Sequence, residues 1–168
     1  MRELSLNILD IAQNSISAGA PLITIEVSEN TTGHILLIGI YDNGKGMSEE
    51  QQKSVIDPFF TTRTTRKVGM GIPLFKMAAE QTGGGLEIES ETGVGTSVRA
   101  TFKTDSVDFT PLGDIASTVQ MLITMNTDRD FVYKHIVNEK EFVCDTREIK
   151  EILGDVPLDT YEVSQWLK

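Results

Sequence analysis

A single carboxylate, Asp42, stands at the end of an apolar run and is followed at once by a glycine-rich turn. The run, residues 35–41, is rich in branched aliphatics and too short for a helix of its own, so we expect a strand that ends where the glycines begin. Gly44 and Gly46 permit backbone angles that other residues resist, and they leave no side chain in the way of a ligand. A carboxylate in this setting suits the recognition of a purine. Taken alone, the same residues also describe an ordinary turn with a solvated Asp42, which is the more common meaning.

Polar side chains form a narrow stripe on the first predicted helix, residues 3–18. Its members follow steps of three, four and three and so share one face: Asn7, Asp10, Asn14 and Ser17. The rest of the circumference is largely apolar, so the stripe costs free energy in a core unless it meets water, a metal or a ligand. Oxygen ligands one turn apart, at Asp10 and Asn14, suit a hydrated Mg²⁺ with an attacking group beside it. A helix whose narrow exposed edge is simply polar is the alternative.

A third group of residues has the composition of a phosphate-binding loop. Arg63 is followed by two more basic residues within five positions of an acidic chain, in a Thr-rich segment that we interpret as a mobile lid. Gly69 and Gly71 lie just before the helix predicted for residues 72–80, whose free N–H groups and dipole attract phosphate. A solvated basic loop and a tight turn into a helix are the alternatives, and the sequence contains no P-loop pattern.

The elements that must position these residues alternate between strands and helices. Alternation of apolar residues predicts strands over 24–28, 35–41, 86–90 and 96–103, with a later hairpin over 130–137 and 141–144. Helical periodicity and capping residues predict helices over 3–18, 48–55, 72–80, 111–125, 146–153 and 159–167. We find no internal repeat and no low-complexity segment.

Composition limits the classes of partner. The chain has 168 residues and a net charge of −10, which argues against a general nucleic-acid or anionic-membrane surface. Cys144 is the single cysteine, so a disulfide framework is excluded, and no Cys/His set has metal-site spacing. We recognise no signal-peptide pattern and no apolar run of membrane-spanning length in the sequence. We therefore expect a soluble cytoplasmic protein.

The motifs occur in a fixed order that resembles the ATP-binding domain of the GHKL superfamily: gyrase-type ATPases, the heat-shock chaperone, histidine kinases and mismatch-repair ATPases. The order is the helix with Asn14, the Asp-x-Gly-x-Gly turn, Phe-Phe-Thr-Thr-Arg, Gly-x-Gly before a helix, and Gly-Val-Gly-Thr at 93–96. The resemblance covers about residues 3 to 103. The lid and the last two boxes are most similar to bacterial sensor histidine kinases, whereas residues 10–20 look more like the mismatch-repair branch.

The resemblance implies a Bergerat-type fold and a role for each matching residue. It implies that Asn14 ligates Mg²⁺, that Asp42 accepts from the adenine amino group, and that Thr96 supports the adenine pocket through a water. The glycines at 44 and 46 then admit the base, and Gly69 and Gly71 cradle phosphates under the lid that carries Arg63. Asp10 falls where hydrolytic members carry a Glu that acts as base, and it is the catalytic candidate, with a side chain one methylene shorter.

One further departure concerns the phosphoacceptor. A histidine kinase needs a dimerisation helix with a phosphoacceptor His ahead of this domain, and here the helix with Asn14 begins at residue 3. His34 falls in a predicted hairpin and His135 in a later strand, so we interpret both as surface or sheet residues. ATP binding is therefore the firm inference, and self-phosphorylation on His is not inferred.

The fold expected is an α/β two-layer sandwich, with a mixed sheet covered on one face by helices and a C-terminal α+β extension. We divide the chain into an ATP-binding domain, 1–103, and an extension, 104–168, that packs or docks a partner. The expected function is an Mg²⁺-ATP-binding regulatory protein that transfers phosphate to a protein in trans. A nucleotide-dependent switch of the anti-sigma-factor kind and a slow ATPase are the alternatives. The expected partners are ATP and a protein, with a homodimer left open and with neither nucleic acid nor membrane.

Overall fold

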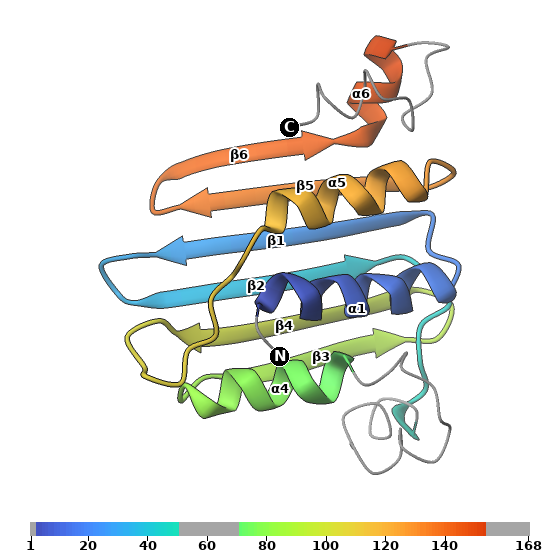
Figure 1. The fold of residues 1–168 in the computed structure, drawn as a ribbon. Helices are drawn as coiled ribbons and strands as arrows, with labels where there is room; N and C mark the ends of the chain where they lie inside the picture. The colour runs from blue at the N-terminus through green and yellow to red at the C-terminus, as the bar shows by residue number, and fades with distance from the viewer. Residues whose placement is uncertain (1–2, 51–70, 154–168) are drawn as a thin grey trace.

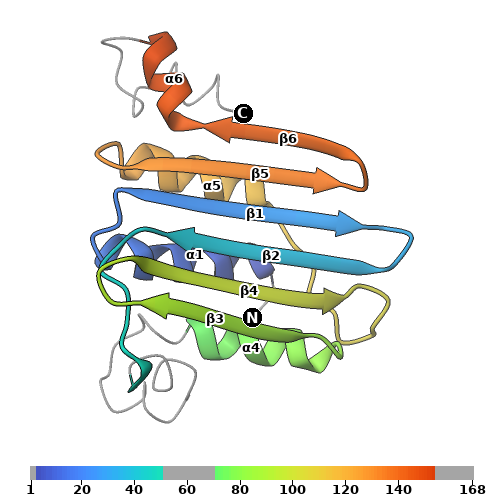
Figure 2. The same cartoon turned by 180° about the vertical axis from the view of Figure 1, so that it is seen from behind.

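The part of the chain that the structure describes forms a six-stranded sheet with helices packed on one face (Figure 1). A computed structural model describes residues 3–50 and 71–153. The strand order is β3-β4-β2-β1-β5-β6, and α1, α4 and α5 lie side by side on one face, while Figure 2 shows the strands from the other side. The α/β sandwich with a mixed sheet is therefore confirmed. The elements are α1 (Leu4–Ser17), β1 (Leu22–Asn30), β2 (Ile35–Asp42), α4 (Gly71–Gln81), β3 (Gly85–Glu91), β4 (Gly95–Lys103), α5 (Ile115–Met125), β5 (Asp130–Val137), β6 (Lys140–Asp145) and α6 (Thr146–Leu153).

Alternation along the strands separates the core from the open face of the sheet. In the middle of the sheet, Ile25 of β1 pairs with Ile40 of β2, and Ile40 pairs in turn with Val98 of β4. All three side chains are at most 2% exposed and belong to one hydrophobic core with the inner sides of the helices. Successive strand residues point to opposite faces, so the neighbours of these residues lie on the open face. There Tyr41 donates a hydrogen bond to Glu26 at 3.2 Å.

The C-terminal segment continues the same sheet. Strand β5 pairs in parallel with β1, and β6 closes the edge as an antiparallel hairpin with β5. Phe131 and Tyr133 of β5 stand opposite Ile23 and Ile25 of β1 and share their core. Helix α5 packs beside α1 over this half of the sheet (Figure 1). A division of the chain at residue 103 stays a prediction.

Helix α5 begins later than the helix predicted for residues 111–125, which was wrong at its start. The carbonyls of Pro111 and Leu112 accept hydrogen bonds from the Leu4 and Ser5 amides, at 2.8 and 2.9 Å. These carbonyls thereby satisfy amides of the first turn of α1 that have no partner within the helix. Gly113 then has φ 79°, and Asp114 caps the helix by accepting from the Ser117 amide.

Two other predicted helices lie wholly or largely beyond the described residues. Of the helix predicted for 48–55, the described part shows helical backbone at residues 49–50, and the helix predicted for 159–167 lies outside. In residues 3–50 and 71–153, no helix combines the length and the apolar character needed to cross a bilayer.

Candidate functional site

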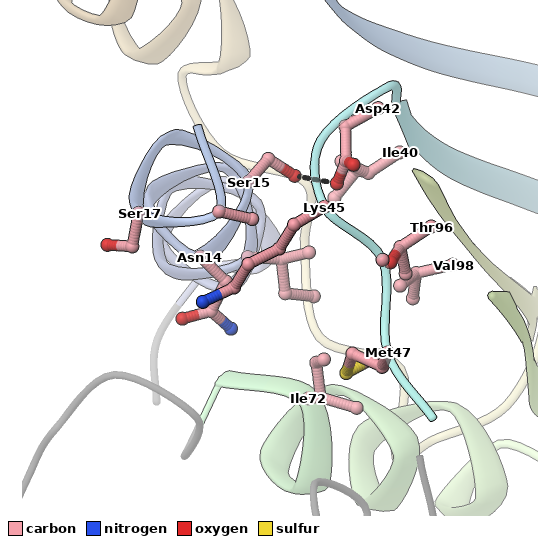
Figure 3. A pocket seen from close by; sticks show the side chains of 13 residues that line it. Asn14, Ser15, Ser17, Ile40, Asp42, Lys45, Met47, Ile72, Thr96 and Val98 are labelled. Atoms are coloured by element: carbon pink, nitrogen blue, oxygen red, sulfur yellow. Dashed lines mark hydrogen bonds between the residues drawn. The ribbon is translucent and has the colours of Figure 1, made fainter. Parts of the chain in front are cut away.

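A cavity of about 260 Å³ opens between the C-terminal half of α1, the end of β2, the start of β4 and the start of α4 (Figure 3). Its size is near the lower end of the range typical of small-molecule pockets, about 300 Å³. Its walls combine buried aliphatic side chains with a few polar groups. The lining residues are Ile11, Asn14, Ser15, Ser17, Ala18, Ile40, Asp42, Lys45, Gly46, Met47, Ile72, Thr96 and Val98.

Asp42 is held in place by hydrogen bonds to both of its carboxylate oxygens. Oδ2 accepts from the Ser15 hydroxyl at 2.6 Å, and Oδ1 accepts from the Gly44 amide at 2.9 Å. Each carboxylate oxygen has two acceptor positions, so Asp42 can still accept a hydrogen bond from a ligand. Ser15 was missed by the sequence reasoning, because its position on α1 is on the sheet-facing side rather than in the polar stripe. The hydroxyl one residue after Asn14 was the available signal.

The glycine turn after Asp42 is packed tightly from two sides. Gly46 has φ 73°, and a Cβ there would overlap the Glu91 carbonyl oxygen. A Cβ on Gly44 would lie 2.9 Å from the Ala18 carbonyl oxygen. Between them, the Lys45 amide donates to Ala18 O at 3.1 Å and its carbonyl accepts from the Gly93 amide at 2.7 Å. The turn therefore needs glycine at both positions, and Gly46 lines the cavity while Gly44 is buried behind it.

Thr96 belongs to a small hydroxyl network on the neighbouring strand β4. Its Oγ1 lies 2.8 Å from the Ser90 Oγ, and Ser90 Oγ also accepts from the Met47 amide at 2.8 Å. Thr96 pairs with Asp42 across the β2–β4 ladder, so the two polar side chains enter the cavity at the same level of the sheet. Val98 and Ile40 lie one step further along these strands and form the apolar floor.

Asn14 carries a polar atom suited to a cation. Its Oδ1 is buried and has no hydrogen-bond partner in the described part of the chain. An unpartnered amide oxygen fits Mg²⁺, which binds oxygen ligands and keeps several waters when it accompanies phosphates. Within residues 3–50 and 71–153, no three His, Cys, Asp or Glu side chains gather as a metal cluster. Asn14 could hold a metal here together with oxygens of the ligand and water.

The other predicted site residues are placed differently. Asp10 lies on the exposed side of α1, one turn before Asn14, and is not among the residues that line the cavity. Gly71 is the first residue of α4, whose next residue, Ile72, lines the cavity. Arg63 and Gly69 lie outside the described residues. The catalytic and phosphate-binding assignments of all four stay predictions.

The two histidines lie at the far end of the sheet from Asp42. His34 is in the β1–β2 turn with φ 56°. His135 is hydrogen-bonded on both ring nitrogens, to the Tyr133 hydroxyl at 2.7 Å and to Glu29 at 2.6 Å. The register places Glu29 opposite Leu36, six residues from Asp42 along β2. His34 is thus a turn residue and His135 a sheet residue, as the sequence predicted.

Comparison with known proteins identifies a family and several relatives of this chain. Residues 1–106 match the family described as histidine kinase-, DNA gyrase B- and HSP90-like ATPase. The nitrogen regulation protein NtrY of Azorhizobium caulinodans is 35% identical over 59% of this chain and 13% of its own length. The sensor histidine kinase ZraS of Escherichia coli is 29% identical, over 54% of this chain and 19% of its own. Sporulation kinase C of Bacillus subtilis is 31% identical, over 52% and 20%. The chain thus spans a fifth or less of these relatives.

A solved structure shares the fold. The Aquifex aeolicus MutL ATPase domain complexed with ADP aligns with a TM-score of 0.55, over 91% of this chain and 69% of that one. At 15% sequence identity this likeness speaks to the fold alone. The alignment extends past residue 106 into the C-terminal half of the sheet, because 91% of the chain is covered.

Proposed function

This chain belongs to the histidine kinase-, DNA gyrase B- and HSP90-like ATPase family, and we propose that it binds ATP with Mg²⁺ in the cavity beside Asp42 and transfers a phosphoryl group to a protein in trans. The observation that carries the proposal is the fixed carboxylate of Asp42 above an apolar floor. A carboxylate accepts from the exocyclic amine of adenine, whereas guanine offers a carbonyl at that place. The aliphatic side chains of Ile40 and Val98 suit the flat faces of the base.

The remaining groups divide between base and phosphates. Thr96 stands beside Asp42 and supports the adenine end, through a water as the family resemblance implies. Asn14 would hold Mg²⁺ through its unpartnered Oδ1. Bound Mg²⁺ would neutralise charge on the phosphate oxygens. In the transfer itself, a nucleophile of the acceptor would attack the γ-phosphorus, the bond to the β,γ-bridging oxygen would break, and ADP would leave.

A second function, a nucleotide-dependent switch with little chemistry, is favoured by the position of Asp10. A general base has to come within hydrogen-bond reach of the proton that it removes, directly or through one water. Asp10 is exposed and outside the cavity lining. In the switch, nucleotide occupancy alone would control a partner protein. The slow ATPase lies between the two functions.

One experiment separates the three. The protein is incubated with γ-labelled ATP and Mg²⁺, alone and with lysate from its source, and label on protein and released phosphate are both counted. The kinase function predicts label on a lysate protein, which Asp42→Asn abolishes. Released phosphate without label indicates the ATPase. If a separate binding measurement shows that ATP binds but neither product forms, the switch is indicated. If ATP does not bind, the proposal is contradicted.

A further inference from the structure

Lys45 is the one cationic residue among those that line the described cavity. It lies between Gly44 and Gly46, and its backbone is fixed on both sides by the hydrogen bonds to Ala18 and Gly93. The position of its Cα is therefore set by Ala18, the residue that follows α1, on one side and by the β3–β4 turn on the other. Figure 3 shows the side chain extending away from the turn, across α1 and toward the carboxamide of Asn14.

Lys45 forms no ion pair with another residue of the described structure. The ion pairs that Lys and Arg form within residues 3–50 and 71–153 engage Lys76, Arg99, Arg147 and Lys150, and none of them includes Lys45. The Lys45 side chain is exposed, so its ammonium is accessible to a solute in the cavity. A long flexible side chain on a rigid turn can follow an anion without disturbing the turn.

The polar groups of the cavity form two sets, one at the end of the sheet and the other on the side of α1. Asp42 and Thr96 are paired at the sheet end, and Asn14 lies on α1, where the Lys45 side chain extends toward it. A ligand whose uncharged base sits at Asp42 would extend its anionic part toward Asn14 and Lys45. We infer that Lys45 is a specificity-determining residue whose ammonium binds the phosphates of the nucleotide beside Asn14, so that the site prefers nucleotides over nucleosides. This inference rests on the proposed function.

The alternative is a solvated lysine that only completes the turn. It predicts that the charge is irrelevant to ligands and that replacing it acts, if at all, on the shape of the turn. The two are separated by comparing ligands with the same base and different charge. Binding of adenosine, ADP and ATP is measured by calorimetry, with Mg²⁺ and with EDTA, for the wild type, Lys45→Gln and Lys45→Arg. Lys76→Gln is the matched control, because Lys76 lies on α4 outside the cavity lining and pairs with Glu80 at 3.1 Å.

We expect Lys45→Gln to weaken ADP and ATP binding about tenfold, with and without Mg²⁺, and to leave adenosine unchanged. Lys45→Arg restores most of the affinity, and Lys76→Gln has no effect on any ligand. The dependence of ATP affinity on salt concentration becomes shallower in Lys45→Gln, because one fewer charge meets the phosphates. Melting temperatures, recorded in parallel, show that each variant is folded.

Two results overturn the inference while the proposed function survives: wild-type ATP affinity and salt dependence in Lys45→Gln, or an equal loss for adenosine and ATP. The second would mean that Lys45 acts through the turn rather than through its charge. If the wild type binds neither adenosine nor ATP, the proposed function fails and the inference fails with it.

Discussion

The Ser15 hydroxyl donates a 2.6 Å hydrogen bond to Asp42 Oδ2, joining α1 to the end of β2 across the base of the cavity. The bond fixes the direction in which the carboxylate presents its remaining acceptor positions. Ser15 is 4% exposed, so the hydrogen bond is largely shielded from bulk solvent. A buried residue that the polar stripe did not include thus positions the residue on which the proposed function depends.

Ser15→Ala is accordingly expected to weaken adenosine and ATP binding to the same extent. Loss of one hydrogen bond to a charged group corresponds to about 1.5 kcal/mol, or about tenfold in the dissociation constant. Calorimetry with both ligands measures it. Ser17→Ala is the control, since Ser17 lines the cavity but is exposed on the outer side of α1. Unchanged adenosine affinity in Ser15→Ala would show that the hydrogen bond does not matter to the base.

Asp42→Asn is expected to abolish measurable adenine-nucleotide binding while the protein stays folded. The amide can turn its NH₂ toward the adenine amine, so a donor faces a donor, at a cost of about 1.5–3 kcal/mol for the lost bond and more for the mismatch. GTP should bind the wild type poorly for the related reason. Asp105→Asn removes the same charge from an exposed turn after β4 and serves as the control. Wild-type ATP affinity in a folded Asp42→Asn protein would refute the assignment.

Asn14→Ala distinguishes the contribution of the metal to ATP binding from that of the adenine base. We expect weaker Mg²⁺-dependent ATP binding with adenosine affinity nearly intact, because the proposed adenine contacts come from Asp42 and Thr96. The ligand-free variant should lose no stability, since the change removes a buried oxygen that has no partner in the described structure and introduces a better helix former. Gln13→Ala, on the exposed side of α1, is the control. Equal losses for ATP with Mg²⁺ and for adenosine would contradict this geometry.

Gly46→Ala tests the turn itself. The left-handed backbone at φ 73° disfavours a side chain, and a Cβ would also overlap the Glu91 carbonyl oxygen. Gly93→Ala imposes a similar conformational penalty at φ 82°, but its Cβ would have no atom within 4 Å. We expect a loss of about 3 kcal/mol in the free energy of unfolding for Gly46→Ala and about 1 kcal/mol for Gly93→Ala. Urea denaturation compares the two variants. Equal losses would mean that the backbone near Glu91 shifts to accommodate the added Cβ without a loss of stability.

Ionisation of Tyr133 is expected to make the free energy of unfolding depend on pH in the alkaline range. Burial raises the pKa of Tyr133 to about 12 from its ordinary value of 10.0, and the negative charge of Glu29 adds to the effect. The unfolded chain therefore ionises first, so the contribution of Tyr133 to stability is complete below pH 10 and is lost as the pH rises toward about 12. Tyr133→Phe should make the decline of the unfolding free energy shallower in this window. Urea denaturation at several alkaline pH values, with absorbance titration of phenolate, measures both. An unchanged decline would rule Tyr133 out.

Local chemistry made much of the site predictable, and non-local contacts account for the rest. Asp42 and Asn14 converge because each is specified by its own short motif and the sheet brings β2 beneath α1. Ser15 was missed because its hydrogen bond to Asp42 joins residues 27 positions apart. The placement of Lys45 likewise depends on backbone contacts with Ala18 and Gly93. For the same reason the start of α5 was wrong: the carbonyl of Pro111 caps α1 instead of beginning a helix, a contact between residues more than 100 positions apart.

The place of β1 between β2 and β5 has a consequence for local opening of the sheet. β1 exchanges backbone hydrogen bonds with β2, which ends at Asp42, and on its other side with β5. Amides of β5 can exchange with solvent through separation from β1 or through disruption of the strands beneath the cavity. A nucleotide held at Asp42 raises the free energy of the second route and leaves the first unchanged. Slower deuterium uptake in β5 on nucleotide binding would therefore report how tightly the C-terminal strands share the stability of the nucleotide site, without any contact between them and the ligand.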